Sequence, residues 1–469
     1  MIENFGELEK IVSLAQRRNC EFAEARKIQK SLTTVTVMGK DFKKFNFNEK
    51  GYNFRIIKKG RLSFKFSEKL DELESMAEIE TKKVSEVRHS YKLAETDQKP
   101  TALNIDSGYI DSRHIEKTPL EEFRRILCGS CFSTRRAKCI FGLIDNLRRH
   151  AYVNSEHFQL RSTTNHLFLT ITVLLKSRKY ILSEAIPMMS TSSINEDLIS
   201  KDTKALIKEA DMFSNAKTIK PQKTIDVVLS PQIAASFIHE LVHQLEADIV
   251  LKGKSDLVKR SSLGLDQSLT VIDTAGTKEF DWRYSYDDEG VKKMETVLIE
   301  NGKVQNLLQN RETAARLGDA LTGNAYVHGY KFLPIVAQKF IEVNKGDHSF
   351  HEILEEIGEG LYLFRPPQTD IAKYDGKEII IKILHGYQIR NGTLARPVKN
   401  IVVKTKNISE TLSNLVAFSK ERKTVFVSCG KYGREYMIGV LTPYVATKFN
   451  VLPAGALSVI PPTLRLAIP

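Results

Sequence analysis

The segment from Ser230 to Asp248 constrains this chain most, because it predicts an apolar helix that also carries ionisable side chains. Ser230 is a favourable N-cap residue, and Pro231 suits the first helical position. Four apolar side chains share one face: Ile233, Phe237, Leu241 and Leu245. The roughly opposite face carries His239, His243 and Glu246.

Two of these residues form a candidate metal site. His239 and His243 are four residues apart, so a helix places both imidazoles on one side, one turn apart. This spacing suits one zinc ion, and Glu240 flanks it where a general base would stand. The alternative is a helix whose polar face holds solvated histidines.

A catalytic zinc site with three protein ligands needs one more donor, and water takes the fourth position. We predict Cys429, because it ends the apolar, β-like run Val425–Val427 and precedes a Gly turn. Glu246 is the competing donor, although a carboxylate in that position more often orients a ligating His.

Length and composition favour a soluble protein of two or three domains. The chain has 469 residues, of which 42% are hydrophobic and 27% charged, and no apolar stretch is long enough for a membrane span. The first nine residues lack the pattern of a signal peptide, and five Cys do not suggest a disulfide scaffold. We therefore expect a cytoplasmic protein. The net charge of +13 permits attraction to nucleic acid or acidic peptides without indicating either.

The first half predicts an α+β domain over residues 1–222. Helical spacing occurs at 4–19, about 68–84, 119–128, 134–150 and 194–214. Strand patterns occur at Phe22–Ile28, Thr33–Met38, Tyr52–Ile57, Arg61–Phe66 and over 152–183. Lys58–Gly60 resembles a hairpin turn, and 92–118 is polar and loop-like. The polar stretch 215–223, which includes Pro221, suggests the domain boundary.

Residues 223–469 predict a second domain that is richer in strands. The expected strands are Thr224–Leu229, Met294–Ile299, Ile379–Leu384, Gly386–Ile389, Val425–Val427 and Tyr436–Val440. Asn301-Gly302 and Asn391-Gly392 are strong turn signals.

Several motifs in this order resemble the TldD/PmbA family of metallopeptidases. They are the helix ending at Asp248, Asp287–Gly290, Val297–Gly302, Ala315–Gly318, Thr322–Asn324, Gly360–Tyr362, Asn391-Gly392, Pro397-Val398 and Ser428–Lys431. In the first half the similarity rests mainly on Gly51–Arg61.

The resemblance implies an N-terminal α+β domain and a C-terminal, barrel-like domain that carries the metal-binding helix. It implies one zinc per chain, held by His239, His243 and Cys429, with Glu240 as base. It also implies a homodimer, or a heterodimer with a homologous subunit, that encloses a chamber for unfolded peptide. Because the metal motif is present, the chain resembles the active, TldD-like subunit.

One departure from the family concerns the helix motif. The family usually separates its two His by five residues with Gly before the second, whereas here the separation is four and Val242 precedes His243. Five residues need a local helix distortion, and four need none. The change should preserve zinc binding, but it affects where Glu240 stands.

Three other interpretations compete with a zinc peptidase. Cys128 and Cys131, with Cys139 beyond and His114 or His150 as further donors, have the spacing of a second metal or redox site, although buried thiols are the simpler explanation. The basic, aromatic stretch from Lys40 to Lys69 could bind nucleic acid, but a half-buried sheet explains it better, because it coincides with the strand signature of the family. The third alternative is a non-catalytic assembly subunit.

Polar residues elsewhere have simpler explanations. His328 and His385 suit ordinary core or surface positions better than a cleft. Asp287, Asp288 and Glu289 fit either a solvated acidic turn or a cluster that orients a ligand or a basic loop.

Overall fold

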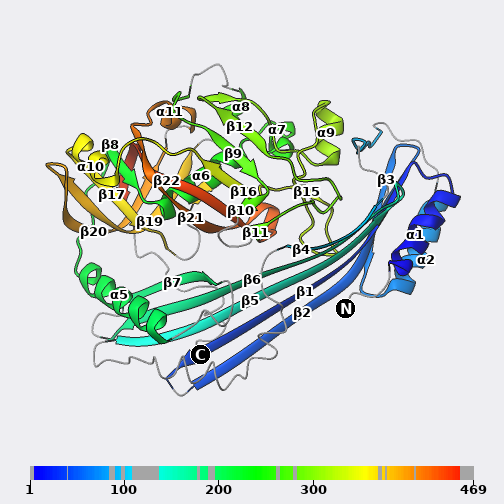
Figure 1. Cartoon of the computed structure of the whole chain (residues 1–469), viewed down its shortest axis with the longest axis horizontal. Coiled ribbons are helices and arrows are strands. Elements are labelled where there is room, and N and C mark those ends of the chain that lie inside the picture. Colours follow the sequence, from blue (N-terminus) through cyan, green and yellow to red (C-terminus); the bar gives the residue numbers. More distant parts are fainter. Residues whose placement is uncertain are drawn as a thin grey trace.

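The computed structural model describes residues 5–39, 41–83, 90–96, 101–107, 137–176, 180–188, 196–259, 265–277, 282–367, 372–374, 378–405 and 408–454. It is a mixed α+β fold in which strands predominate. Two parts are evident in Figure 1: a long, curved N-terminal sheet, and a C-terminal body, formed by residues 222–454, that lies against one face of that sheet.

The N-terminal sheet runs in the order β3-β2-β1-β5-β6-β4. β4 and β7 share the outer edge of β6: β4 pairs with its first half and β7 with its second half. Its pairings are antiparallel, except for the parallel pair β4–β6. Four strands have 17 or 18 residues and therefore extend about 55–60 Å. The strands are β1 (Phe22–Met38), β2 (Asp41–Lys58), β3 (Arg61–Ser67), β4 (Thr101–Ser107), β5 (Ala137–Asn154), β6 (Phe158–Leu175) and β7 (Tyr180–Met188).

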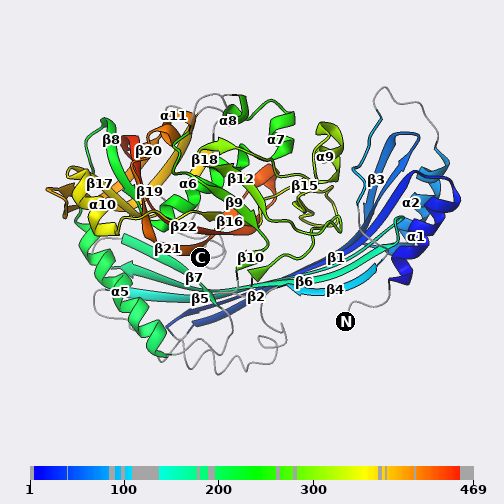
Figure 2. The ribbon, with the colours of Figure 1, turned by 45° about the horizontal axis from the view of Figure 1, so that its top comes forward.

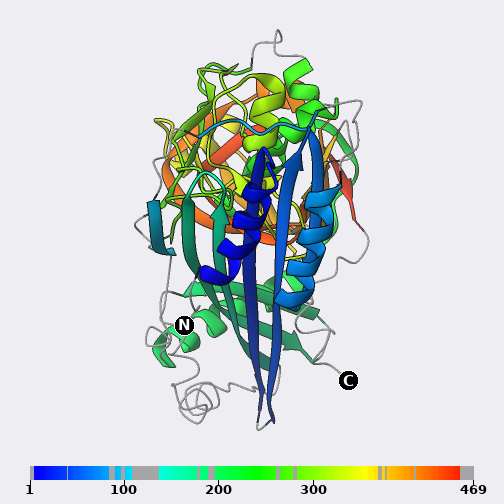
Figure 3. The same ribbon diagram turned by 90° about the vertical axis from the view of Figure 1, so that its right-hand side faces the viewer.

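Helices cover the two ends of this sheet. At one end, α1 (Gly6–Arg17) and α2 (Leu70–Lys82) lie side by side and pack on β1, β2, β3 and β5 (Figure 3). At the other end, α5 (Glu196–Ser214) packs on β6 and β7 and also contacts the C-terminal body. All three helices confirm the helical spacing in the sequence.

The helix expected over 134–150 is wrong, because residues 137–150 form most of β5. Apolar residues are consecutive in this strand, as in Ile140-Phe141 and Ala151–Val153, since neighbouring elements cover most of both its faces. β5 pairs along nearly its whole length with β1 and β6. The sequence of β5 therefore lacks the apolar–polar alternation of a half-exposed strand, and pairing with neighbouring strands determines its conformation.

Smaller differences concern strand lengths and loops. The strands expected at Phe22–Ile28 and Thr33–Met38 are one continuous strand, β1, and the loop expected over 92–118 contains β4. The helix expected at 119–128, together with Cys128, Cys131 and His114, lies outside the described residues.

The C-terminal body contains a large mixed sheet in which five strands close into a ring. β8 pairs with β17, β17 with β19, β19 with β20, β20 with β22, and β22 returns to β8. These strands are β8 (Gln222–Leu229), β17 (Gly360–Arg365), β19 (Ile379–Arg390), β20 (Thr393–Lys404) and β22 (Tyr436–Pro453). The ring confirms the expected barrel-like character.

Further strands extend the sheet beyond the ring. They are β9 (Val271–Thr274), β12 (Thr296–Glu300), β13 (Lys303–Val304), β16 (Phe340–Val343), β18 (Ala372–Tyr374) and β21 (Ala417–Cys429). Two small ribbons pair β10 (Gly276–Thr277) with β11 (Trp282–Arg283), and β14 (Ala325–Tyr326) with β15 (Ile335–Val336). The expected turns at Asn301-Gly302 and Asn391-Gly392 are confirmed, and both residues of each turn have positive φ.

One helix, α6 (Pro231–His243), is buried among the strands of this body. It contacts ring strands β8, β17, β19 and β22 as well as β18 and β21, and nearly all of its residues are buried. Shorter helices lie around it: α7 (Ala247–Leu251), α8 (Asp256–Lys259), α9 (Arg311–Leu317), α10 (Phe350–Ile357), α11 (Ile408–Ser413) and a 3-10 turn at Lys431–Gly433. Among the described residues, no helix has the length and apolar character needed to cross a bilayer.

The acidic run 287–289 joins the C-terminal body to the N-terminal sheet. Asp288 accepts two hydrogen bonds from Arg148 of β5 at 3.2 and 2.8 Å, and Glu289 pairs with Arg55 of β2 at 2.6 Å. Asp287 accepts from backbone N–H groups of its own turn and of Ala325. All three acidic side chains are buried, so the alternative of a solvated turn is wrong. Figure 2 shows the C-terminal body seated above the sheet.

Candidate metal centre

The helix that carries the candidate ligands begins as its sequence predicts. Ser230 Oγ accepts a hydrogen bond from the Ile233 N–H at 3.4 Å, and Pro231 occupies the first turn. Because the strands of the C-terminal body surround α6, its histidines are not solvated. His239 is only 5% exposed, which rules out the alternative of a polar helix face in water.

The helix does not continue to Asp248 as expected. It ends at His243, and Glu246 has an extended backbone that pairs with Leu308 before α7 begins. The Leu308 N–H donates to the Leu245 carbonyl at 2.9 Å, and the Ala247 N–H donates to the Leu308 carbonyl at 3.0 Å. This pairing replaces the next helical turn and directs Glu246 back toward His243.

The three predicted ligands come together although Cys429 is 186 residues from His243. One donor atom from each of His239, His243 and Cys429 lies within 4.8 Å of the others. Cys429 Sγ is 3.3 Å from His243 Nε2, and the two imidazole centroids are 4.5 Å apart. The last residue of β21 therefore meets the last turn of α6.

Their hydrogen bonding leaves these donors suited to a metal. His239 Nε2 is buried and has no hydrogen-bond partner among the described residues. A buried polar atom without a partner is costly, and a metal ion would satisfy it. Two imidazoles and a thiol are also the donor types that zinc prefers.

Glu246 contacts the other nitrogen of His243. Its carboxylate accepts from His243 Nδ1 at 2.6 Å and also pairs with Lys431 Nζ at 2.8 Å. Lys431 in turn binds Asp248 at 2.7 Å and the Val336 carbonyl at 2.8 Å. A carboxylate on Nδ1 fixes the ring and leaves Nε2 directed toward Cys429.

The electrostatics of the site favour a cation. Burial lowers the pKa of His239 well below its usual value, which keeps that ring neutral and able to ligate. Burial would also lower the pKa of His243, but Glu246 and Cys429 raise it well above the usual value. The same groups that attract a proton to His243 would attract a metal ion.

Glu240 lies at the edge of this group. Its Oε1 is 3.8 Å from His239 Nδ1, and its side chain is 12% exposed. It is therefore close to the candidate ligands and retains access to solvent, as a group that exchanges protons with substrate requires.

A cavity of about 190 Å³ lies between the N-terminal sheet and the C-terminal body, and two of its lining residues adjoin the candidate ligands. Gln338 lines it and donates from Nε2 to the His239 carbonyl at 3.1 Å. Tyr436 also lines it and is the cross-strand neighbour of Cys429. The sequence did not indicate Gln338, because its contact with His239 joins residues 99 positions apart. Tyr436 is close to Cys429 in the sequence, but no pattern shows that its ring lines a cavity.

The remaining predicted residues lie elsewhere. His385 is buried, binds Glu209 at 2.6 Å and stacks on Phe213, as expected of a core His. His328 lines the cavity, in contrast to the ordinary position expected for it. Cys139 is a buried free thiol, which agrees with the simpler explanation for it.

Comparison with known proteins identifies the family. Residues 222–451 match the PmbA/TldA metallopeptidase C-terminal domain. A metalloprotease of Methanothermobacter thermautotrophicus is 27% identical over 427 residues, which are 86% of this chain and 89% of that protein. A zinc metalloprotease TldD homolog of Saccharolobus solfataricus is 30% identical over 227 residues, 47% of this chain and 50% of that relative.

The fold is similar to that of a solved structure. TldE from Thermococcus kodakarensis superposes with a TM-score of 0.71 over 95% of this chain and 99% of its own, at 15% identity. With the buried His-His-Cys group, these similarities show that the chain belongs to the TldD/PmbA family of metallopeptidases.

Proposed function

We propose that this chain is a zinc-dependent peptidase that hydrolyses unfolded or flexible peptides at the centre formed by His239, His243 and Cys429. The observation that supports it most is the buried cluster of three donors, with His239 Nε2 unpartnered, beside Glu240 and a cavity. Zinc bound by two imidazoles and one thiolate would lower the pKa of a bound water toward about 7 and polarise a carbonyl.

The side chains around this centre have distinct roles in the proposal. A Glu240 carboxylate oxygen takes the proton of the attacking water and delivers it to the leaving amine. Glu246 holds His243 through Nδ1, and Lys431 holds Glu246, so the ligand ring stays oriented. Glu246 is thus a positioning residue, and Cys429 is the third ligand.

A Glu240→Gln variant tests the assignment. It should keep its zinc and its fold while peptide hydrolysis falls by roughly 10²- to 10⁴-fold, because the amide accepts no proton. Glu300→Gln, at an exposed position on β12, is the matched control and should cleave at the wild-type rate. Undiminished cleavage by Glu240→Gln would remove Glu240 from the mechanism.

The substrate form and the assembly are part of the same proposal. The C-terminal body is rich in strands, and an unpaired edge would bind an extended peptide through its backbone. A folded protein must open locally to present such a segment, so cleavage should follow the population of its opened state. We propose a dimer, with a second copy or a homologous subunit, as the working form.

The test compares one substrate protein in its native form with a destabilised variant that contains the same cleavage site. The destabilised form should be cut faster, and the active enzyme should elute as a dimer. Equal cleavage of both forms, or a fully active monomer, would favour an open-cleft peptidase instead.

A further inference from the structure

We propose that the cavity beside the metal centre is a binding pocket for a carboxylate of the peptide substrate, with Lys339 and Lys30 as its cationic groups. The proposal rests on the peptidase function proposed above and adds a substrate class to it. The carboxylate belongs either to an acidic side chain or to the C-terminus of the peptide, and the chemistry of recognition is the same.

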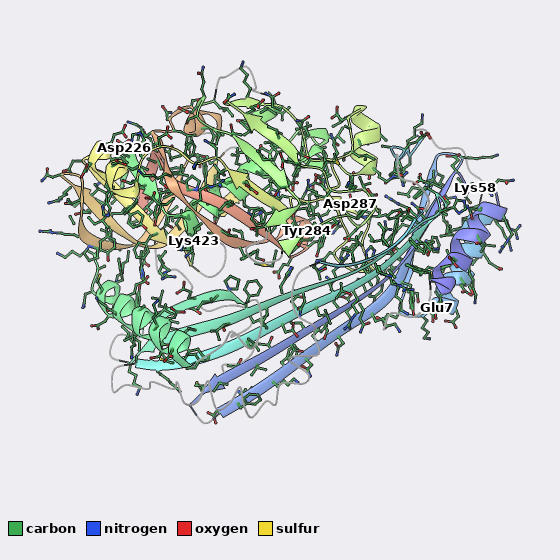
Figure 4. All side chains as sticks on the ribbon, in the orientation of Figure 1. Glu7, Lys58, Asp226, Tyr284, Asp287 and Lys423 are labelled. Atoms are coloured by element: carbon green, nitrogen blue, oxygen red, sulfur yellow. The ribbon has the colours of Figure 1, made fainter. Side chains whose placement is uncertain are left out.

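The position of the cavity suits a substrate group that extends from the metal centre. Gln338, which precedes Lys339, donates to the backbone of the candidate ligand His239. Tyr436, the cross-strand neighbour of Cys429, and Tyr326 both line the cavity, and their ring centroids are 4.8 Å apart. Figure 4 labels Tyr284, another lining residue, on the side of the C-terminal body that faces the long strands.

Lys339 is a buried cation with few partners. Its side chain lines the cavity, and the residue is 6% exposed. Nζ donates one hydrogen bond, to the Ala325 carbonyl at 3.3 Å, and lies 5.1 and 5.4 Å from the Tyr284 and Tyr326 ring centroids. Within the described part of the chain it forms no ion pair. An ammonium has three donors, so two remain for a ligand.

The surplus charge inside the cavity is positive. Lys30 of β1 faces it from the opposite wall and likewise has no ion pair among the described residues; burial lowers its pKa to about 8. Arg148 is neutralised by its bidentate contact with Asp288. Glu435 is exposed, so it does not neutralise the buried ammonium of Lys339. Asp287, Asp288 and Asp273 act on Lys339 from beyond ion-pair distance, and burial still lowers its pKa. A buried cation without a direct partner is costly, and a ligand carboxylate in contact with Nζ would supply one.

The size of the cavity restricts the ligand. Its volume of about 190 Å³ is below the ~300 Å³ at which pockets for drug-sized molecules begin, so it accepts one side chain or a chain terminus. Tyrosine rings on its walls suit the methylene groups beside a carboxylate. These features fit an acidic residue or a C-terminal residue of a peptide better than a larger anion.

The experiment uses four versions of one unfolded peptide. The first has a single internal Glu and a free C-terminus; the second replaces Glu with Gln; the third is amidated; the fourth has both changes. With zinc-loaded wild type, the first peptide should have a KM about tenfold below that of the fourth, because a charge-assisted hydrogen bond is lost. The second and third peptides identify which carboxylate binds.

Variants connect this preference to the pocket. Lys339→Met should reduce the KM ratio between the fourth and first peptides to about one, and Lys339→Arg should restore part of it. Lys303→Met, at an exposed position on β13, is the control and should keep the wild-type ratio. If Lys339→Met does not fold, Lys30→Met serves the same test and should lower the ratio. A wild-type ratio of one, or a ratio unaltered by these variants, refutes the pocket.

A binding measurement separates this inference from the peptidase proposal. Fluorescence anisotropy with the Glu240→Gln variant should show tighter binding of the first peptide than of the fourth. If wild type cleaves none of the peptides but this difference persists and needs Lys339, the peptidase function fails and the pocket stands. If the peptides are cleaved but bind alike, the pocket fails and the peptidase function stands.

Discussion

Arg55→Met should be among the most destabilising single substitutions outside the metal centre. Arg55 is buried and links the two parts of the fold, since it pairs with Glu289 at 2.6 Å and with Glu24 at 2.9 Å. Both carboxylates are almost fully buried. Without Arg55, the one hydrogen bond left to the Glu289 carboxylate within the described residues is that from the Arg311 N–H at 2.8 Å. Removing one member of a buried ion pair typically costs about 3–5 kcal/mol.

The pKa of Glu24 gives a second value for how much this buried cluster stabilises the folded state. Burial alone would raise it, but Arg26 and Arg55 lower it from 4.5 to about 2. That difference corresponds to about 3 kcal/mol in favour of the folded state. Because the folded pKa lies below the unfolded value, this stabilisation is present above pH 4.5 and is lost as the pH falls toward 2.

Urea denaturation, followed by circular dichroism and by the fluorescence of Trp282, measures the effect. The free energy of the first unfolding transition should be about 3–5 kcal/mol lower in Arg55→Met than in the wild type. Arg316→Met is a suitable control, because the Arg316–Glu312 pair spans 3.7 Å with the two side chains 55% and 32% exposed, and such pairs contribute at most about 1 kcal/mol. Adding Glu289→Gln should recover part of the loss. If Arg55→Met costs no more than Arg316→Met, the cluster does not stabilise the fold as inferred.

Three further predictions concern zinc and backbone packing. Metal analysis should find about one zinc per wild-type chain and much less in His243→Ala; equal contents would eliminate the site. Cys429→Ser should weaken zinc binding strongly, because a neutral hydroxyl replaces a thiolate, whereas Glu246→Gln should weaken it less; the reverse order in a zinc titration would exchange their roles. Gly290→Ala should lower the melting temperature, because Gly290 has φ +78° and an added Cβ would lie 2.5 Å from the Phe158 ring; an unchanged melting curve would contradict this.

The local features of the fold were predictable from the sequence. The N-cap at Ser230 and the Asn-Gly turns depend on a few neighbouring residues, and the structure has them as expected. β5 was not predictable, because its apolar residues run consecutively and its strand character comes from pairing with β1 and β6. Pairings of this kind are not visible in one sequence.

The candidate site also has some residues that the sequence predicts and others that it does not. His239, Glu240 and His243 belong to one helical motif, whose spacing alone indicates metal chemistry. Lys431 carries no such signal, because its partners Glu246 and Asp248 come from a remote segment. Lys339 carries none either, because the cavity that it lines exists only in the folded structure. Tertiary structure creates such buried contacts and cavities, and the pattern of a single sequence does not reveal them.

The closed ring of strands has a consequence for the order in which the protein matures. β8 near residue 222 completes its pairing only when β22, which ends at Pro453, has been synthesised. Cys429 reaches His243 through the same late strands, since β21 pairs with β22. Contacts so distant along the chain form slowly. A nascent chain that has exposed α6 but lacks β22 therefore cannot assemble the complete donor set, so the candidate metal centre forms only with the finished C-terminal body.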